Sequence, residues 1–599
     1  MKFRVLILIL WVGLLGSCEK EQAEKEVVEG KGSVEFKALL NSYNKGTLSL
    51  DPIKATFAGL KEYNADFPNY LSKSYKDSAI AFYQKYQNEL KGYDDELLSP
   101  SENMSKAVLE WECDLMLKEL SFRKELMPID QMWSKNLVMG QLASGQSAQP
   151  FNTVEDYEAW LKRLDGYVIW MQTAEQRMKE GAKIRLILPT SLIIKVIPQL
   201  RPMALTEVED HLFYSPIKQF PNTFTDEEKE RLTTMYREML VDKLIPAYRS
   251  LYEYVSTDYL DQGRNSSGIN TIPNGDKYYA FSIQKYTTTT MTAAEIHQLG
   301  LDEVARILAE MEKVKEEVGF EGDMKSFFEF VRNDKKLMPY TQPEEVIDGF
   351  NSIRGKMKSK LDDLFNKKPE TKFVVRRTEA FREASSSAEY NPGALDGSRP
   401  GVFYVPIPDA TKYNVYGDEA LFLHEAIPGH HYQMSLTQEN DSLPDFRKTL
   451  WYSAYGEGWA LYVESMGKEL GLYKDPFQYF GMLSGEMHRA IRLVVDTGLH
   501  SKEWTREQAI QYCLDNEAES EASIVSEVER YMANPGQALS YKIGQLKILE
   551  LRKKAKIEMG ENFDIAEFHD QVLETGCVPL ALLEDKIDNW IASKDTLEP

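Results

Sequence analysis

The sequence predicts a mainly α-helical protein with one small β-sheet, and three observations support this fold class. Long segments repeat apolar residues at helical spacing, whereas residues 372–377 and 401–407 are short runs rich in Val, Phe and Tyr. Turn residues separate these two strand-like runs. The composition, 43% hydrophobic and 28% charged, is that of a folded globular chain and excludes wholesale disorder or a fibre.

The first 17 residues have the pattern of a lipoprotein signal peptide. Two basic residues precede an apolar run, 5–15, that is too short to cross the roughly 30 Å hydrocarbon core of a bilayer. The letters LGSC at 15–18 resemble a bacterial lipobox, so we expect Cys18 to become the lipidated first residue. An ordinary secretory signal is the alternative. Residues 18–33 are charged and lack aromatic side chains, which predicts a flexible tether.

The rest of the chain, residues 34–599, shows no internal repeat and no linker long enough to separate independent domains. We therefore expect a single unit, with a division into two lobes as the alternative. The clearest predicted helix runs from 292 to 317, where Thr292 and Glu295 can form a capping box before a helical apolar pattern. Similar patterns cover residues 79–90, 105–126, 154–180, 226–254 and 543–559.

The two strand-like runs predict a small antiparallel sheet beside the helical body. The sheet directly precedes the main cluster of histidines along the chain, so we expect it to form one wall of the same cleft.

Charge and cysteine content argue against nucleic-acid binding and against a disulfide-rich fold. The net charge of −23 argues against nucleic acid as a partner, because phosphate binding needs a clustered basic surface. Apart from Cys18, the cysteines are Cys113, Cys513 and Cys577, an odd number at unrelated spacings. They predict buried free thiols rather than a disulfide framework or a zinc knuckle.

Three of the eight histidines fall within residues 424–431. His424 and Glu425 begin like the H-E-x-x-H helix of zinc hydrolases, in which two imidazoles hold the metal and the glutamate acts as base. Position 428, where the second histidine would stand, is a proline, and the next histidines follow six and seven residues after His424. In an unbroken helix His430 would point roughly 120° away from His424.

The proline and the following glycine resolve this mismatch. Pro428 removes a backbone donor and Gly429 permits unusual dihedral angles, so the pair predicts a local bulge that brings His430 back towards His424. His431 is the competing second ligand, since seven residues are close to two helical turns. Of the two, the sequence favours His430, with His431 as a nearby hydrogen-bond donor to the substrate.

A third zinc ligand is expected from the segment YGEGWALYVE. Glu457 follows His430 by 27 residues, and its neighbours Gly456 and Gly458 allow close backbone approach. Glu464 lies on roughly the same helical face and is the alternative ligand. Three protein ligands leave a fourth position open for water, which is typical of a catalytic zinc site.

The remaining catalytic groups follow from the chemistry of peptide hydrolysis. In such a site the metal activates water, and Glu425 accepts the proton as the water attacks a carbonyl. The developing oxyanion needs a further donor, for which Tyr541 is the first candidate and His500 and His431 are the next.

Several sequence blocks together resemble the bacterial lipoprotein family called domain of unknown function 885. The resemblance covers nearly the whole mature chain. That family groups with zincin-type metallopeptidases, so it implies a large helical zincin-like body over residues 34–599. It also implies a gluzincin-like site with His424, His430 and Glu457 as zinc ligands and Glu425 as base. The blocks read HEAIPGHHYQ, GEGWALYVE, RLVVDTGLH, NPGQALSYKIG, EIHQLGL and DGSRPG.

These observations predict a zinc-dependent peptidase of the cell envelope, anchored to a membrane through Cys18 and acting on a peptide substrate. Arg399 or Arg492 would hold a substrate carboxylate if the enzyme trims carboxyl ends. One alternative is a zinc amidase acting on cell-wall peptides through the same residues. The other is a catalytically silent lipoprotein that binds a peptide or a metal, and a potential base at Glu425 argues against it.

Overall fold

The structure is a computed structural model that describes residues 32–379, 383, 387–394, 397 and 399–595. The expected signal peptide (1–17), Cys18 and the expected tether up to residue 31 lie outside the described residues. Among the described helices, none combines the length and the apolar character that crossing a membrane requires.

The described chain is mainly α-helical, as predicted. Its first half contains α1 (Ser33–Leu50), α2 (Pro52–Phe57), α3 (Lys73–Leu90), α4 (Pro100–Ser121), α5 (Lys135–Ala143), α6 (Val154–Lys183), α7 (Thr190–Leu205), α8 (Asp226–Glu238), α9 (Ile245–Tyr254), α10 (Leu260–Gln262), α11 (Gly275–Thr287), α12 (Ala293–Glu317), α13 (Met324–Asn333) and α14 (Pro343–Leu364).

The second half begins with three short strands and continues with helices only. The elements are β1 (Phe373–Arg377), β2 (Glu389–Asn391), β3 (Gly401–Val405), α15 (Asp418–Glu425), α16 (His430–Glu439), α17 (Asp445–Lys448), α18 (Ser453–Ser465), α19 (Pro476–Ser501), α20 (Arg506–Asn516), α21 (Glu521–Ala533), α22 (Ser540–Met559), α23 (Ile565–Leu573) and α24 (Leu580–Asp595).

The predicted helices are confirmed, with shifts at their ends. The capping box before α12 is present, with the Thr292 side chain accepting from the Glu295 backbone and the Glu295 side chain accepting from the Thr292 backbone. The helix expected over 226–254 is divided into α8 and α9 by a π-helical stretch, Met239–Leu244. Pro246 at the start of α9 has no N–H for the regular helical ladder, which accounts for the interruption.

The sheet is mixed, and the prediction of an antiparallel sheet is wrong in this detail. Its strand order is β1-β3-β2, with β1 parallel and β2 antiparallel to β3. The segment between the two predicted strands supplies β2, which pairs with one edge of β3. Because the chain has already reversed direction at β2, it reverses again into β3, which therefore runs parallel to β1.

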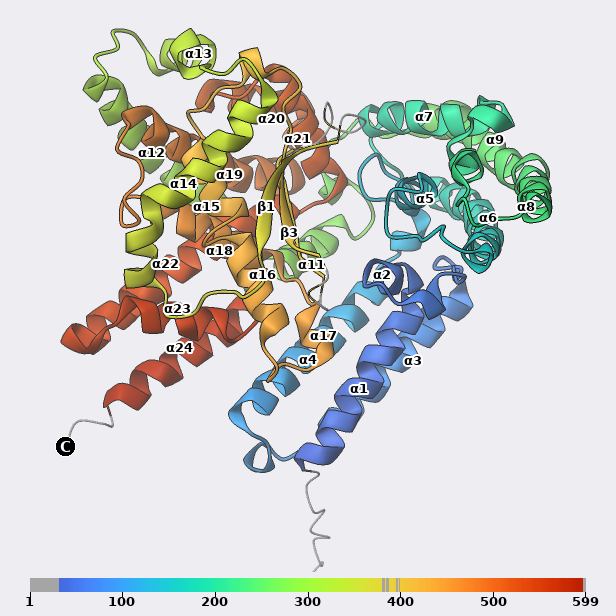
Figure 1. Ribbon diagram of the computed structural model, residues 1–599, viewed down its shortest axis with the longest axis horizontal. Helices are drawn as coiled ribbons and strands as arrows, with labels where there is room; N and C mark the ends of the chain where they lie inside the picture. The colour runs from blue at the N-terminus through green and yellow to red at the C-terminus, as the bar shows by residue number, and fades with distance from the viewer. Residues whose placement is uncertain (1–31, 380–382, 384–386, 395–396, 398, 596–599) are drawn as a thin grey trace, which may run out of the picture.

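Two separate hydrophobic cores divide the described chain into two lobes (Figure 1). The aromatic lobe comprises α2 and α5–α10 and is built around large rings such as Trp160 and Trp170 of α6. The site lobe comprises α1, α3, α4 and α11–α24 with the sheet. The chain passes between the lobes several times before α11, so no single linker in the sequence separates them.

The core of the site lobe is organised by helix pairs. α12 packs along α19 and α18 packs along α22. A Cβ at Gly300 in α12 would lie 2.7 Å from Leu493 Cβ of α19, so a glycine is needed for this close approach. Cys113, Cys513 and Cys577 are buried free thiols, as predicted.

Candidate metal centre

A break between α15 and α16 positions the two candidate histidine ligands. α15 ends at Glu425 and α16 begins at His430, so the predicted bulge is a full interruption of the helix. A Cβ at Gly429 would lie 2.0 Å from the His424 carbonyl oxygen, which no side chain tolerates. The turn can therefore fold back only with glycine at this position. Trp459 Nε1 of α18 donates to the Pro428 carbonyl at 2.9 Å and holds the turn.

His424, His430 and Glu457 come together, and their ligand atoms all lie within 4.8 Å of one another. Glu457 Oε2 is 3.5 Å from Nε2 of each histidine. Four tetrahedral ligands at about 2.1 Å from a zinc ion are roughly 3.4 Å apart. The spacing and the donor types of this triad therefore fit zinc. The side chains are largely buried, and the structure brings in His430 rather than the competing His431.

Glu464 contacts His424 on the ring nitrogen that faces away from Glu457, and it is not part of the triad. Its Oε1 is 2.6 Å from His424 Nδ1, whereas His424 Nε2 faces Glu457. A carboxylate in this place accepts the Nδ1–H and fixes the tautomer in which Nε2 is free to bind metal. The interpretation of Glu464 as an alternative ligand is thus replaced by an orienting role.

The charges of the centre attract a cation. Burial alone would lower the pKa of His424, but hydrogen bonds to Glu457 and Glu464 outweigh it and raise this pKa to about 10. Burial would raise the pKa of Glu457, yet the two imidazoles hold it well below its usual range. His430 Nδ1 is buried with no hydrogen-bond partner in the described structure, and its ring packs against Trp451, 5.8 Å away between ring centres.

Glu425, the expected base, is the last residue of α15 and is buried next to the triad. Burial raises the pKa of its carboxyl, and the nearby Glu457 raises it further, while the imidazoles and Arg489 act in the opposite direction. A carboxylate in this environment has a higher proton affinity than one in water, which suits a general base.

Tyr541 lies near Glu457 because α18 and α22 approach very closely. A Cβ at Gly458 would lie 2.5 Å from Gly544 Cα, so the two glycines let the helix backbones touch. Tyr541 stands one turn before Gly544 on α22 and is half-buried. Burial and the charge of Glu457 raise the pKa of Tyr541, which keeps its hydroxyl protonated as a donor.

The turn before α22 is fixed by a buried carboxylate of α19. Asp496 accepts a hydrogen bond from Tyr279 Oη at 2.6 Å and from the Gly536 backbone N–H at 3.1 Å. Gly536 has a φ of +83°, a conformation that favours glycine. The RLVVDTGLH and NPGQALSY blocks thus cooperate in placing the start of α22, where Tyr541 lies.

His431 is not directed towards the triad. Consecutive residues of a helix point about 100° apart, so His431 faces the sheet while His430 faces Glu457. The His431 ring is buried, with Nδ1 2.8 Å from Tyr390 Oη and 3.3 Å from Ser435 Oγ. Its expected role as a donor to substrate therefore has no support in this geometry, and it joins α16 to β2 instead.

His500 and Arg399 also lie apart from the triad. His500 is fully buried, with Nδ1 accepting from the Ile269 N–H and Nε2 facing the Tyr531 carbonyl, both at 3.0 Å. Both ring nitrogens are thus used by backbone, and no donor is left for an oxyanion. Arg399 is exposed on the turn before β3, and within the described residues no hydrogen bond or ion pair joins it to the triad.

Two further residues at the centre were not predicted from the sequence. Trp451 is 43% exposed and packs against the ring of His430, which marks the side of the centre that faces solvent. Arg489 of α19 is near enough to Glu425 to influence its pKa. Neither lies in a block that carried chemistry, although the short sequence distance of Arg489 from Arg492 was a usable signal.

Comparisons with known proteins identify the family of this chain and two structures of similar fold. The model of a family described as "Bacterial protein of unknown function (DUF885)" matches residues 52–587. A crystal structure of a candidate lipoprotein from Colwellia psychrerythraea is similar with a TM-score of 0.86 and 29% identity, over 94% of this chain and 99% of that chain. No curated protein matches the sequence.

A structure of a candidate lipoprotein of unknown function from Shewanella oneidensis is similar with a TM-score of 0.74 and 20% identity. The match covers 92% of this chain and 99% of that chain. At this level of identity the similarity concerns the fold alone.

Proposed function

For this chain, which belongs to the bacterial family of unknown function DUF885, we propose the function of a zinc-dependent peptidase. The observation that carries the proposal is the triad of His424, His430 and Glu457 with Glu425 buried beside it. Two imidazoles and one carboxylate leave one position free on a tetrahedral metal, which is the arrangement of catalytic rather than structural zinc.

Each residue of the centre has a separate role in the proposed peptide hydrolysis. Zinc, when bound, would supply Lewis acidity towards water and the scissile carbonyl. Glu425 accepts the proton of the attacking water and can return it to the leaving amine. Tyr541 donates its Oη–H towards the carbonyl oxygen, where negative charge develops. Glu464 holds the His424 ring, and Trp459 holds the turn that presents His430.

The experiment compares two variants of the purified protein. Glu425→Gln should retain zinc and lose hydrolysis, because it removes the base and no ligand. His424→Ala should lose the metal itself. Zinc content is measured by elemental analysis, and hydrolysis is followed by mass spectrometry on a library of short peptides. Unchanged turnover in Glu425→Gln would remove Glu425 from the mechanism.

The same experiment separates the competing functions. Cleavage of cell-wall stem peptides but not of ordinary peptides would identify an amidase. Full zinc content without any hydrolysis by the unmodified protein would identify a silent binding lipoprotein.

We also propose that the protein is held at the bacterial cell envelope by a lipid on Cys18. The sequence LGSC at 15–18 and the similarity to a candidate lipoprotein support this. Mass spectrometry of the membrane-extracted protein should find a lipid at Cys18, and Cys18→Ala should move the protein out of the membrane fraction. Equal membrane retention of the variant would contradict the anchor.

A further inference from the structure

Two arginines of α19 lie near the metal centre with hydrogen-bond donors that no described residue uses. Arg492 is only 7% exposed, and its Nη1 has no partner. Arg489 is half-buried, its Nε has no partner, and it forms no ion pair within the described part of the chain. Leaving a buried donor unsatisfied costs free energy, so these N–H groups are available to bind a ligand.

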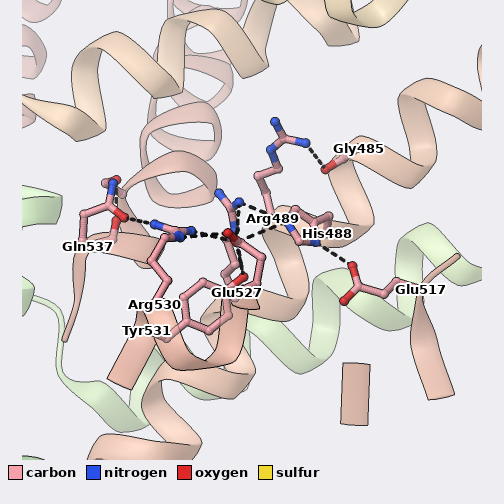
Figure 2. Close-up of polar contacts among 10 residues, drawn as sticks. Gly485, His488, Arg489, Glu517, Glu527, Arg530, Tyr531 and Gln537 are labelled. Atoms are coloured by element: carbon pink, nitrogen blue, oxygen red, sulfur yellow. Dashed lines mark hydrogen bonds and ion pairs between the residues drawn. The ribbon is translucent and has the colours of Figure 1, made fainter. Parts of the chain in front are cut away.

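Arg489 is placed beside the carboxylate that orients the first zinc ligand. The point where a Cβ of Gly485 would stand lies 3.4 Å from Glu464 Oε2 and 3.5 Å from Arg489 Nη1. The other oxygen of Glu464 is 2.6 Å from His424 Nδ1. Arg489 Nη1 donates to the Gly485 carbonyl at 3.2 Å, which fixes the side chain along α19 (Figure 2).

Arg492 is held against the candidate oxyanion donor. Its guanidinium carbon lies 4.5 Å from the centre of the Tyr541 ring. Arg492 Nε donates to Tyr531 Oη at 3.2 Å and Nη2 donates to Glu527 at 3.0 Å, so the group cannot rotate freely. The unpartnered Nη1 is therefore a fixed donor, prepared before any ligand arrives.

The guanidinium group of Arg492 is only partly paired by the charges around it. The Glu527 carboxylate is 2.9 Å from Arg530 Nη2 (Figure 2). It is also 3.0 Å from Arg492 Nη2, so two guanidinium groups share it. Glu517 is bound by an imidazole, and within the described residues it makes no ion pair with an arginine. Arg492 and Arg530 thus share one carboxylate, and Arg492 keeps a donor from which a further carboxylate can accept.

We infer that Arg489 and Arg492 form a binding site for the carboxyl-terminal carboxylate of a peptide substrate. The inference rests on the proposed peptidase function. A planar carboxylate suits the fork of a guanidinium group, and the two arginines lie beside Tyr541 and Glu464, so a carboxylate bound there would be close to the bond that is cleaved. The enzyme would then remove residues from carboxyl ends.

The test compares peptides that differ only at the carboxyl end. Short N-acetylated peptides are prepared as free acids, as carboxamides, and as carboxamides that end in glutamate. The last set supplies a side-chain carboxylate instead of a terminal one. Binding is measured by calorimetry with the zinc-loaded full chain carrying Glu425→Gln, so that the readout does not need turnover.

We expect the free acids to bind about 100-fold more tightly than either set of carboxamides, because the unpartnered N–H groups of the two arginines gain a charged acceptor. Adding Arg489→Met should abolish this preference, and Arg489→Lys should keep part of it. Arg552→Met is the control, since Arg552 is a partly buried arginine of α22 whose charge is already paired with Glu469. It should keep the full preference.

Equal binding of acids and carboxamides would overturn the inference. Preference for the glutamate carboxamides would assign the arginines to an acidic side chain instead, and this too contradicts the assignment to a carboxyl end. In the active enzyme, Arg489→Met should slow the hydrolysis of acids to the rate of carboxamides. An equal loss for both would place Arg489 at the reacting bond and also contradict the inference.

The outcomes separate this inference from the proposed function. Hydrolysis of acids and carboxamides at equal rates would leave a peptidase without the carboxylate site. Binding of acids that depends on Arg489, without hydrolysis by the unmodified chain, would leave the carboxylate site without a peptidase.

Discussion

The two lobes bury different kinds of side chain. The core of the aromatic lobe consists of Trp160, Trp170, several tyrosines and aliphatic residues. Arg163 is a charged side chain that is buried in this lobe. The site lobe buries many acids and bases among its hydrophobic residues, including Asp496 and Lys542. Lys542 forms ion pairs with Glu303 and Glu486. Buried charges contribute little to net stability even when paired, so their concentration in one lobe points to chemistry there.

Arginines show the same difference. Arg163 in the aromatic lobe uses Nε, Nη1 and Nη2, which donate to the Asp66 carbonyl, Gln149 Oε1 and Thr56 Oγ1. It is a structural residue whose donors are used. Arg489 and Arg492 in the site lobe retain donors without partners. Burial of an arginine therefore does not by itself indicate a binding site, and the inference for Arg489 and Arg492 depends on their unpartnered donors near the triad.

The largest difference between the lobes should appear in metal binding. Glu457→Ala removes one of the three proposed zinc ligands, so we expect zinc affinity to fall by more than the roughly 100-fold that is typical of losing an outer partner. Far-ultraviolet circular dichroism should remain unchanged, because Glu457 lies on an intact helix. Zinc titration with a competing chelator measures the affinity. Unaltered affinity would show that the triad is not the metal site.

The opposite result is expected in the aromatic lobe. Trp160→Ala should lower the free energy of unfolding by about 3–5 kcal/mol, since a large ring is removed from a closed core. Chemical denaturation followed by tyrosine and tryptophan fluorescence measures the loss. Zinc affinity of the folded protein should stay at the unmodified value, and a parallel loss of zinc would mean that the lobes are not independent in function.

An intermediate effect is expected behind the triad. Glu464→Gln keeps the size of the side chain and removes the charge that orients His424, so zinc affinity should drop about 10- to 100-fold. Glu469→Gln, at an exposed glutamate paired with Arg552, is the control. If the two variants bind zinc equally well, Glu464 does not support the ligand.

The smallest effect concerns acid stability of the site lobe. Burial lowers the pKa of His500 to about 3, against about 6.5 in an unfolded chain. Below pH 6.5 the unfolded state therefore binds a proton that the folded state excludes, and stability is lost as the pH falls. Between pH 7 and pH 5 the loss from this group is about 2 kcal/mol.

His500→Gln removes this contribution, so the stability of the variant should depend less on pH over the same interval. The two proteins are compared by urea denaturation at pH 7 and pH 5. Parallel pH dependence of the two would show that His500 does not carry a lowered pKa.

The sequence was sufficient for the helical fold and for the proximity of His424, His430 and Glu457, because periodic patterns and short motifs carry both. Periodic apolar residues predict helices, and Pro428 with Gly429 predicts the helix break that brings His430 close to His424. The mixed sheet could not be predicted, since β2 has only three residues and its pairing is decided by the chain reversals around it.

The residues that were misassigned failed for a different reason. His431 and His500 are polar groups whose partners come from distant segments, namely Tyr390 and the backbone of Ile269 and Tyr531. A sequence shows that a histidine is near a motif but not which way its ring points. Arg489 was overlooked for the converse reason, because its lack of a partner is visible only in three dimensions.

The contact between Gly458 and Gly544 sets the spacing of α18 and α22, which carry Glu457 and Tyr541. Glu457 and Tyr541 sit on opposite sides of this joint, one on each helix. A single added methyl group at either glycine would push the helices apart and widen the gap between the acidic ligand and the phenol together. The distance between Glu457 and Tyr541 therefore depends on the absence of a side chain at Gly458 and Gly544.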